Sequence, residues 1–139
     1  MPFGGPMADR LAIRELIETY SDAVCRRDMV AWGATWTDDA VWGSRDGALS
    51  GREAIVARCA KVLDGLGYIQ FRALPGAIEV QGDTAQARTY VHTTRTTASG
   101  ELQIFEATYL DTLRRTPDGW RFSGRDIDQP TLHRLATLD

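Results

Sequence analysis

The chain is poor in the residues that mark several common kinds of functional site. It has two cysteines and two histidines among 139 residues. Cys25 and Cys59 do not form a CxxC motif, and His92 and His133 lie far apart, so neither a disulfide framework nor a zinc site is expected. The sequence also lacks a GxSxG motif and a glycine-rich phosphate loop, which argues against esterase and nucleotide chemistry. We therefore expect no metal and no cofactor.

The chain also lacks a large excess of one charge and any long apolar run. Sixteen basic residues stand against nineteen acidic ones, for a net charge of −3. The arginines are scattered along the chain, so nucleic acid is not an expected partner. No apolar stretch approaches the ~18–20 residues that span a bilayer, and the opening MPFGGPM lacks the basic and apolar regions of a signal peptide. We expect a cytoplasmic protein without membrane contact.

The length allows one domain and no more. Domains typically hold ~100–150 residues. The content of 43% apolar and 25% charged residues is that of an ordinary globular protein. Residues 1–139 are expected to form one domain, with a flexible N-terminal segment at residues 1–8 and a C-terminal tail at residues 129–139.

Helical periodicity occupies the first half of the chain. Apolar residues recur every three or four positions over residues 10–27 and again over residues 50–66, and a short helix is expected between them at residues 29–36. Asp9 is expected to cap the first helix, and Ser50 to open a capping box at the third.

Strand periodicity occupies the second half. From Ile78 onward, apolar and polar residues alternate, and β-rich runs cover residues 84–97, 102–115 and 120–129 with turn residues between them. Three helices followed by such an antiparallel meander predict an α+β fold, in which the helices cover one face of a strongly curved sheet. A curved sheet closed by helices favours an apolar pocket for a small molecule.

Several short strings follow one another in an order typical of one family. They are Tyr20, Arg27-Asp28, Trp36-Thr-Asp-Asp-Ala-Val-Trp42, Gly51-Arg-Glu-Ala-Ile55, Val80-Gln-Gly-Asp-Thr-Ala85, Tyr109-Leu-Asp111 and Asp118-Gly-Trp-Arg-Phe122. With these strings, residues 9–128 resemble the SnoaL-like branch of the NTF2-like superfamily, which includes polyketide cyclases, dehydratases of scytalone and bile acids, and ketosteroid isomerase. The resemblance implies an NTF2-like cone, a pocket for a small organic molecule and a homodimer.

The residues that transfer a proton in the dehydratases of this family are only partly matched. Those enzymes use a tyrosine together with an aspartate and a histidine. This sequence keeps Tyr20, but the matching positions hold Cys25 and Phe71. A phenylalanine cannot transfer a proton, so the resemblance does not extend to the dehydratase mechanism.

The ketosteroid isomerases give a second comparison. Tyr20 matches their oxyanion-binding tyrosine, and Asp111 matches the aspartate that stays protonated and donates a second hydrogen bond. The position of their general base falls at Ser44, with Asp46 two residues further on. On this comparison, Tyr20 and Asp111 are the candidate catalytic residues.

Strand alternation indicates which side chains face the helices. Asp111 alternates with Tyr109 and Phe105, and Arg95 falls on the same face of the preceding strand, while His92 falls on the opposite face. Arg95 could bind a carboxylate or enolate of the ligand, or could instead form an ion pair with Asp111. The candidate ligand-binding residues, each of which could also be ordinary core packing, are Trp42, Phe71, Val91, Arg95, Phe105, Tyr109 and Phe122.

Two functions stay open. The first is a cofactor-free lyase, isomerase or cyclase that transfers a proton on an apolar, ring-containing substrate through Tyr20 and Asp111. The second is a non-catalytic ligand-binding or assembly module of the same fold that has lost the Asp/His pair. In both cases the expected partner is a small apolar or aromatic organic ligand. The outer face of the sheet, with Arg88, Tyr90 and His92, is expected to form a homodimer.

Overall fold

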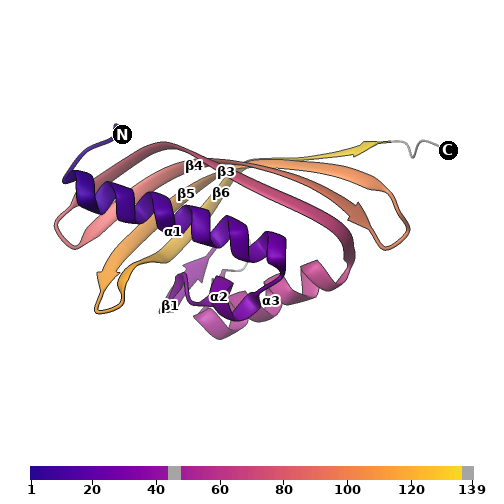
Figure 1. Ribbon diagram of the computed structural model, residues 1–139, viewed down its shortest axis with the longest axis horizontal. Coiled ribbons are helices and arrows are strands. Elements are labelled where there is room, and N and C mark those ends of the chain that lie inside the picture. The colour runs from indigo at the N-terminus through magenta and orange to yellow at the C-terminus, as the bar shows by residue number, and fades with distance from the viewer. Residues whose placement is uncertain (44–47, 136–139) are drawn as a thin grey trace.

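Three helices lie against one face of a curved, six-stranded sheet in the part of the chain that the structure describes, residues 1–43 and 48–135 (Figure 1). The structure is a computed structural model. The helices are α1 Met7–Arg26, α2 Met29–Gly33 and α3 Arg52–Asp64. The strands are β1 Trp36–Trp42, β2 Leu49–Ser50, β3 Leu66–Gln81, β4 Thr84–Thr97, β5 Leu102–Thr116 and β6 Gly119–Leu135. Ser44 and Asp46, which were compared with the general base of the isomerases, lie outside the described residues.

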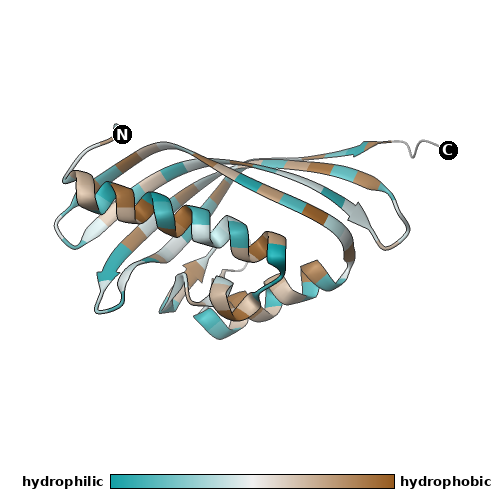
Figure 2. Ribbon diagram, viewed as in Figure 1, coloured by the Kyte–Doolittle hydropathy of each residue, from teal (hydrophilic) through white to brown (hydrophobic). Residues whose placement is uncertain are grey.

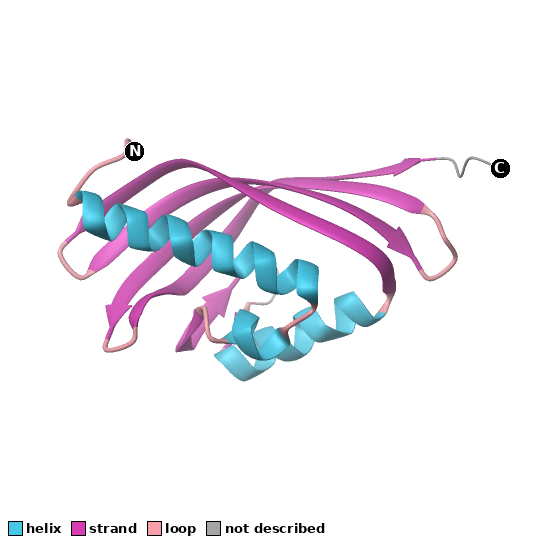
Figure 3. Cartoon of the chain, in the orientation of Figure 1, coloured by secondary structure: helices cyan, strands magenta, loops and turns pink. Residues whose placement is uncertain are grey.

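The sheet is open and mixed. Its strand order is β2-β1-β6-β5-β4-β3, and β1 runs parallel to β6 while the other neighbouring pairs are antiparallel. Figure 3 shows the long strands curving together, with the helices gathered on one side. The expected α+β fold is confirmed, but the sheet is not purely antiparallel. Three successive hairpins, β3–β4, β4–β5 and β5–β6, fix the direction of β6, and that direction coincides with the direction of β1.

The apolar stripe of α1 is its contact surface with the sheet. Its buried residues recur at the helical spacing and are Ile13, Leu16, Ile17, Tyr20, Ala23 and Val24. The helix ends at Arg27, which adopts a left-handed backbone with φ of 60°. The Arg27 guanidinium donates hydrogen bonds to the carbonyl oxygens of Leu63, at 2.8 Å, and Leu66, at 3.0 Å. These bonds satisfy carbonyls at the end of α3, so one residue ties the ends of two helices together.

Neither helix cap expected from the sequence forms. α1 begins at Met7, and the Asp9 carboxylate accepts hydrogen bonds from Arg115 instead of capping the helix. At α3 the residue before the helix is Gly51, with φ of 96° and no side-chain cap. Ser50 still belongs to β2, because its pairing with β1 holds the backbone extended there and keeps its side chain out of the cap position.

Two strands are longer than the sequence pattern suggests. β3 already begins at Leu66, well before the alternating pattern that starts at Ile78. Pro75 interrupts the β pattern in the sequence, but it does not end the strand and only shifts its register with β4. A proline is tolerated there because β3 is an edge strand. β6 continues to Leu135, so residues 129–135 are the end of a strand. Trp36, which we placed at the end of the second helix, is the first residue of β1.

The first residues of the chain run beside the edge of β3. The Gly4 N–H donates to the carbonyl of Ile78 at 2.9 Å, and the Val80 N–H donates to the carbonyl of Gly4 at 3.0 Å. This short bridge occupies free backbone groups that an edge strand would otherwise expose.

The inner face of the sheet holds the core. On β4 and β5 buried and more exposed residues alternate, which confirms the predicted inner face, and Figure 2 shows the matching alternation of hydropathy along the strands. The buried residues of these two strands are Ala85, Ala87, Thr89, Val91, Thr93, Gln103, Ala107, Tyr109, Asp111 and Leu113. Among the described helices, none is long and apolar enough to cross a bilayer.

Candidate functional site

A fully buried arginine lies at the centre of the inner face. Arg125 Nε donates to Asp111 Oδ1 at 2.7 Å, and Nη2 donates to Oδ2 at 3.0 Å. Nη1 donates to the Tyr20 hydroxyl at 2.8 Å. The side chains of Arg125 and Asp111 are 2% and 1% exposed, so water does not screen this ion pair. Side chains from α1, β5 and β6 thus meet at one point.

Aromatic rings surround the guanidinium. The rings whose centroids lie near Arg125 Cζ are those of Tyr109 at 3.9 Å, Tyr20 and Trp36 at 4.9 Å, Trp42 at 5.0 Å and Phe122 at 5.2 Å. These distances are within the ~6 Å range of cation–π contacts. The rings keep water away from the ion pair while offering it electrostatic contacts that aliphatic side chains cannot.

Burial sets the protonation of the groups around the ion pair. It raises the pKa of Tyr20 and of Tyr109, so both phenols stay neutral at physiological pH. Burial also raises the pKa of Cys59, on α3, to about 11, so its thiol stays protonated. Burial raises the pKa of Asp111 and the Arg125 cation lowers it. Because both oxygens of Asp111 accept hydrogen bonds from Arg125, the carboxyl acts as an acceptor here, and not as the protonated donor of the isomerase comparison.

A cavity of about 10 Å³ lies beside the ion pair. Tyr20, Phe71, Thr89, Asp111 and Arg125 contribute to its lining. A cavity of roughly this volume can hold one water molecule. Side chains therefore fill most of the interior, and a ring-sized ligand can enter only if some of them move.

Most of the predicted site residues gather at this cavity. Those that line it are Tyr20, Phe71, Tyr109, Asp111 and Phe122. Trp42 lies next to them, with its ring centroid 6.1 Å from that of Tyr109. The structure thus brings the predicted catalytic pair and four of the predicted ligand-binding residues together.

Arg95 and Phe105 lie farther along the same face. Arg95 Nε donates to Gln103 Oε1 at 3.0 Å, and Arg95 Cζ lies 5.6 Å from the centroid of Phe105. The alternative of an Arg95–Asp111 ion pair is wrong, because Asp111 pairs with Arg125. The strand register explains this: Arg95 lies opposite Gln103 on β5, and Gln103 is roughly 27 Å along the strand from Asp111 at ~3.4 Å per residue.

The two positions that carry proton transfer in the dehydratases contact each other here. The Phe71 N–H donates to Cys25 Sγ at 3.3 Å, and Sγ donates to the Phe71 carbonyl at 3.5 Å. The thiol is therefore tied to the backbone of β3. Cys25 thus joins α1 to the sheet where the dehydratases have a carboxylate.

A larger hollow lies around the edge strand β3 and is lined by side chains from both faces of the sheet. A groove of about 630 Å³ is lined by residues of α1, β3, β4 and β5, among them Arg72, Leu74, Tyr90, His92 and Glu106. The predicted ligand-binding residue Val91 also lines this groove, and does not line the inner cavity. His92 lies on the outer side, as strand alternation predicts.

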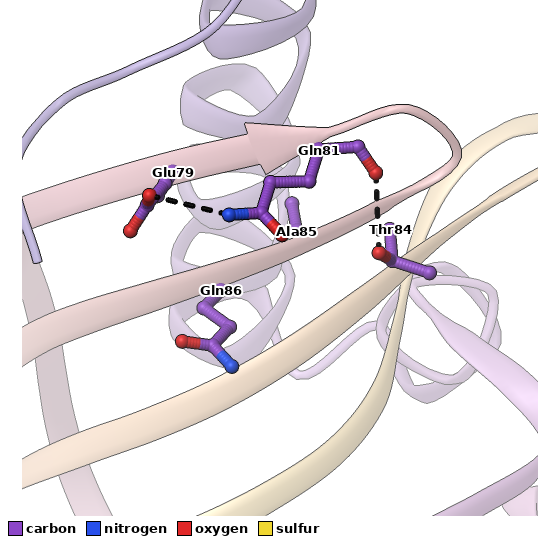
Figure 4. A pocket seen from close by; sticks show the side chains of 5 residues that line it. All are labelled: Glu79, Gln81, Thr84, Ala85 and Gln86. Atoms are coloured by element: carbon purple, nitrogen blue, oxygen red, sulfur yellow. Dashed lines mark hydrogen bonds between the residues drawn. The ribbon is translucent and has the colours of Figure 1, made fainter.

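A third hollow, of about 90 Å³, belongs to the β3–β4 hairpin (Figure 4). Its side chains bond to their own neighbours: Gln81 Nε2 donates to Glu79 Oε1 at 3.4 Å, and the Thr84 hydroxyl donates to the Gln81 carbonyl at 3.3 Å. The hollow is built from one exposed turn, so it offers no buried polar group to a ligand. The inner cavity is the better candidate site.

Comparison with known proteins fits this geometry. Residues 6–126 match the family model described as a SnoaL-like domain. The chain belongs to the SnoaL-like family. A search of curated protein sequences gives no match.

Solved structures similar to this SnoaL-like protein include three from Novosphingobium. A proposed aromatic ring hydroxylase from Novosphingobium aromaticivorans is 26% identical, with a TM-score of 0.84 over 94% of this chain and 96% of its own. A proposed scytalone dehydratase from the same species is 15% identical, with a TM-score of 0.84 over 95% and 91% of the two chains. A hexachlorocyclohexane dehydrochlorinase, LinA-type3, from Novosphingobium barchaimii is 20% identical, with a TM-score of 0.83 over 95% and 93%. These three structures thus share the fold of this SnoaL-like chain.

Simple alternation along β6 misses Arg125, the central residue of the site in this SnoaL-like protein. Trp120 and Phe122 face inward, and a period of two would bring Gly124 inward next. A register shift against β5 after Phe122 adds one residue to β6 and turns Arg125 inward instead. The sequence offers one signal of this register shift, Gly124 itself, because a glycine inside a strand suggests a bulge.

Proposed function

We propose that this protein binds a small, apolar, ring-containing molecule in its aromatic interior and transfers a proton on it, as a cofactor-free lyase, isomerase or cyclase. The observation that carries the proposal is the buried Arg125, held by Asp111 and in contact with the Tyr20 hydroxyl among aromatic rings. Buried polar groups in an apolar cavity are the usual arrangement of a small-molecule site.

The proposed chemistry uses the three groups in different ways. The Tyr20 hydroxyl accepts from Arg125 and keeps its own proton, because burial raises its pKa. It can therefore donate a hydrogen bond to a carbonyl oxygen on the ligand. The Arg125 cation stabilises negative charge that develops on that oxygen when the neighbouring carbon loses its proton. Asp111 holds Arg125 in place through two hydrogen bonds. It is also the available proton acceptor, because it is the one carboxylate that lines the cavity among the described residues.

The similar structures support the class of ligand and not its identity. Two of them are named for a dehydratase and a dehydrochlorinase, and a third for an aromatic ring hydroxylase. Dehydration and dehydrochlorination both require removal of a proton from carbon. The aromatic lining of the cavity in this chain suits a flat or ring-shaped ligand of the same kind.

Proton exchange on a model ketone tests this proposal without knowledge of the substrate. We expect the protein to accelerate exchange of the protons beside the carbonyl of 2-tetralone for deuterium in D₂O, followed by proton NMR. Tyr20→Phe and Asp111→Asn should each slow this exchange by about 10²-fold or more, because each removes a group that acts on the developing enolate. Thr93→Val is the matched control, because Thr93 is buried on the same face but does not line the cavity. Exchange no faster than in buffer would rule out the proton-transfer activity.

The alternative function is a ligand-binding or assembly module without chemistry. Cys25 and Phe71 favour it, because neither residue replaces the carboxylate and imidazole of the dehydratases. On this alternative, 2-tetralone binds to the protein, but the exchange rate is unchanged.

We also propose that the outer-face part of the groove around β3 is the contact surface of a homodimer. Leu74 and Tyr90 in the groove are 67% and 49% exposed, which leaves apolar surface uncovered. Arg72, His92 and Glu106 are successive cross-strand neighbours there, with opposite charges at the two ends of the row. A second copy related by a twofold axis can therefore place its glutamate against the arginine.

Light scattering at micromolar concentration tests the dimer. We expect Leu74→Glu to convert the dimer to a monomer, and Leu11→Glu to leave it intact, because Leu11 is also exposed but lies on α1 outside the groove. A monomeric mass for the unmodified protein would contradict the proposal.

A further inference from the structure

The buried Arg125 has donors to spare. A guanidinium carries five N–H groups. Within the described part of the chain, three of them have acceptors: two bind the Asp111 carboxylate and one binds the Tyr20 hydroxyl. Two N–H groups, one on each terminal nitrogen, are left without an acceptor among the described residues.

Thr89 presents a second unpaired polar group at the same place. The residue is 2% exposed, and its hydroxyl has no hydrogen-bond partner among the described residues. Thr89 and Arg125 line the same cavity of about 10 Å³. Buried polar groups are nearly always hydrogen-bonded, so an unpaired hydroxyl beside unpaired N–H groups points to a missing partner.

The chemistry of the cavity selects an oxygen atom. Arg125 can only donate hydrogen bonds, so any partner of its two remaining N–H groups has to be an acceptor. The missing partner must therefore accept hydrogen bonds, and the volume allows about one atom of the size of a water oxygen.

The charges of the cavity select a neutral oxygen. Asp111 already balances the positive charge of Arg125, and aromatic rings exclude water from the pair. A carboxylate or phosphate would add an uncompensated negative charge to this apolar interior, which is strongly unfavourable. A carbonyl oxygen adds no charge.

We propose that the space between Thr89, Arg125 and Tyr20 is a binding site for one neutral oxygen atom, occupied by a water molecule in the free protein and by the carbonyl oxygen of the ligand in the complex. This inference rests on the proposed ligand-binding function. It names Thr89 as a residue that selects ligands with a carbonyl oxygen over hydrocarbons, while the balanced charge of the Arg125–Asp111 pair disfavours carboxylates.

Three probes with one aromatic ring test the site at pH 7.5: acetophenone, ethylbenzene and benzoate. Their dissociation constants are measured by NMR from the methyl shifts of Ile17, which also lines the cavity. Thr89→Val should weaken the binding of acetophenone about tenfold and leave the binding of ethylbenzene unchanged, since only the ketone loses a hydrogen bond. Thr89→Ser keeps the hydroxyl and should preserve the affinity for acetophenone. Benzoate should bind at least about tenfold more weakly than acetophenone.

Thr93→Val is the control, because Thr93 is also buried on the inner face of β4 but does not line the cavity, and it should change the affinity for neither acetophenone nor ethylbenzene. Equal effects of Thr89→Val on acetophenone and ethylbenzene, or tighter binding of benzoate, would overturn the oxygen site while leaving ligand binding intact. Failure of all three probes to bind would overturn both. A high-resolution crystal structure of the free protein should show a water within hydrogen-bond distance of the Thr89 hydroxyl and Arg125, and an empty cavity would overturn the inference.

Discussion

Burial and ion pairing shift the pKa of Arg125 in opposite directions. Burial lowers the pKa of this guanidinium, but the Asp111 carboxylate raises it further, and the pKa ends above its ordinary value. The side chain is therefore a permanent cation inside an aromatic core. Its partner is what makes the charge tolerable there, because an unpaired charge in such an environment is strongly unfavourable.

We expect Arg125→Met to lower the free energy of unfolding by about 3–5 kcal/mol, because it leaves the Asp111 carboxylate buried without its partner. The double variant Asp111→Leu/Arg125→Met removes both charges and should recover most of that loss. Urea denaturation of the single and double variants measures the coupling. Additive losses in the double variant would show that the two side chains contribute independently.

At the scale of elements, Asp9 ties α1 to the end of the sheet. Its carboxylate accepts hydrogen bonds from Arg115 at 2.9 and 3.1 Å and from Trp120 Nε1 at 3.2 Å. Arg115 also lies over the Trp120 ring, 4.7 Å from its centroid. One acidic residue in the first turn of α1 thus contacts β5 and β6.

We expect the stability that the hydrogen bonds of Asp9 provide to depend on pH. The hydrogen bond from Arg115, then that from Trp120, lowers the pKa of Asp9, so the folded state favours the ionised form. Its contribution to stability is therefore present above the ordinary aspartate pKa of ~3.9 and is lost as the pH falls through the lower folded pKa. Asp9→Asn should destabilise the protein at pH 7 and have a smaller effect below pH ~3.9.

Unfolding in urea across this pH range checks the expectation. Asp83→Asn is the control, because Asp83 also pairs with Arg115 but its side chain is 84% exposed. If the effect of Asp9→Asn on stability does not change with pH, the charge of the carboxylate is unimportant to the contact of Asp9 with Arg115 and Trp120.

The register shift in β6 depends on Gly124. A Cβ atom there would lie 2.7 Å from Thr112 Oγ1. We expect Gly124→Ala to lower the free energy of unfolding by about 1–3 kcal/mol, since the strand that turns Arg125 inward must shift. Adding Thr112→Ala removes the contact and should restore most of the stability. Thermal unfolding of both variants measures the effect, and an unchanged midpoint for Gly124→Ala would contradict it.

At the scale of the whole molecule, the fold keeps its interior nearly full. The inner cavity beside the ion pair has a volume of only about 10 Å³. Phe71 on β3 contributes one wall and is buried. The centroid of the Phe71 ring lies 5.5 Å from that of Tyr20 and 6.4 Å from that of Tyr109. Removal of the Phe71 ring would therefore open space beside both tyrosine rings.

We expect Phe71→Ala to lower the free energy of unfolding by about 3–5 kcal/mol and to enlarge the cavity. Ethylbenzene should then raise the unfolding temperature of the variant more than that of the unmodified protein, because binding to the native state stabilises it. Leu113→Ala is the control, because Leu113 is also buried but does not line the cavity. Equal stabilisation of both variants by ethylbenzene would mean that the cavity is not a special ligand site.

The sequence by itself determined the features that depend on local period. The stripe of α1 and the alternation of β4 and β5 specify which faces are buried, because side-chain direction follows directly from helical or strand geometry. The inward position of Tyr20, Tyr109 and Asp111, and with it most of the cavity wall, follows from these periods.

Only the tertiary structure decided the features that depend on register and pairing. The partner of Asp111 is Arg125 and not Arg95, because one extra residue in β6 reverses its inward face and eight strand positions separate Gln103, which lies opposite Arg95, from Asp111. The parallel pairing of β1 with β6 is likewise invisible locally, because a strand pattern carries no direction. The centre of the site therefore depends on contacts between strands, and apart from Gly124 in β6 these have no signature in the sequence of any one strand.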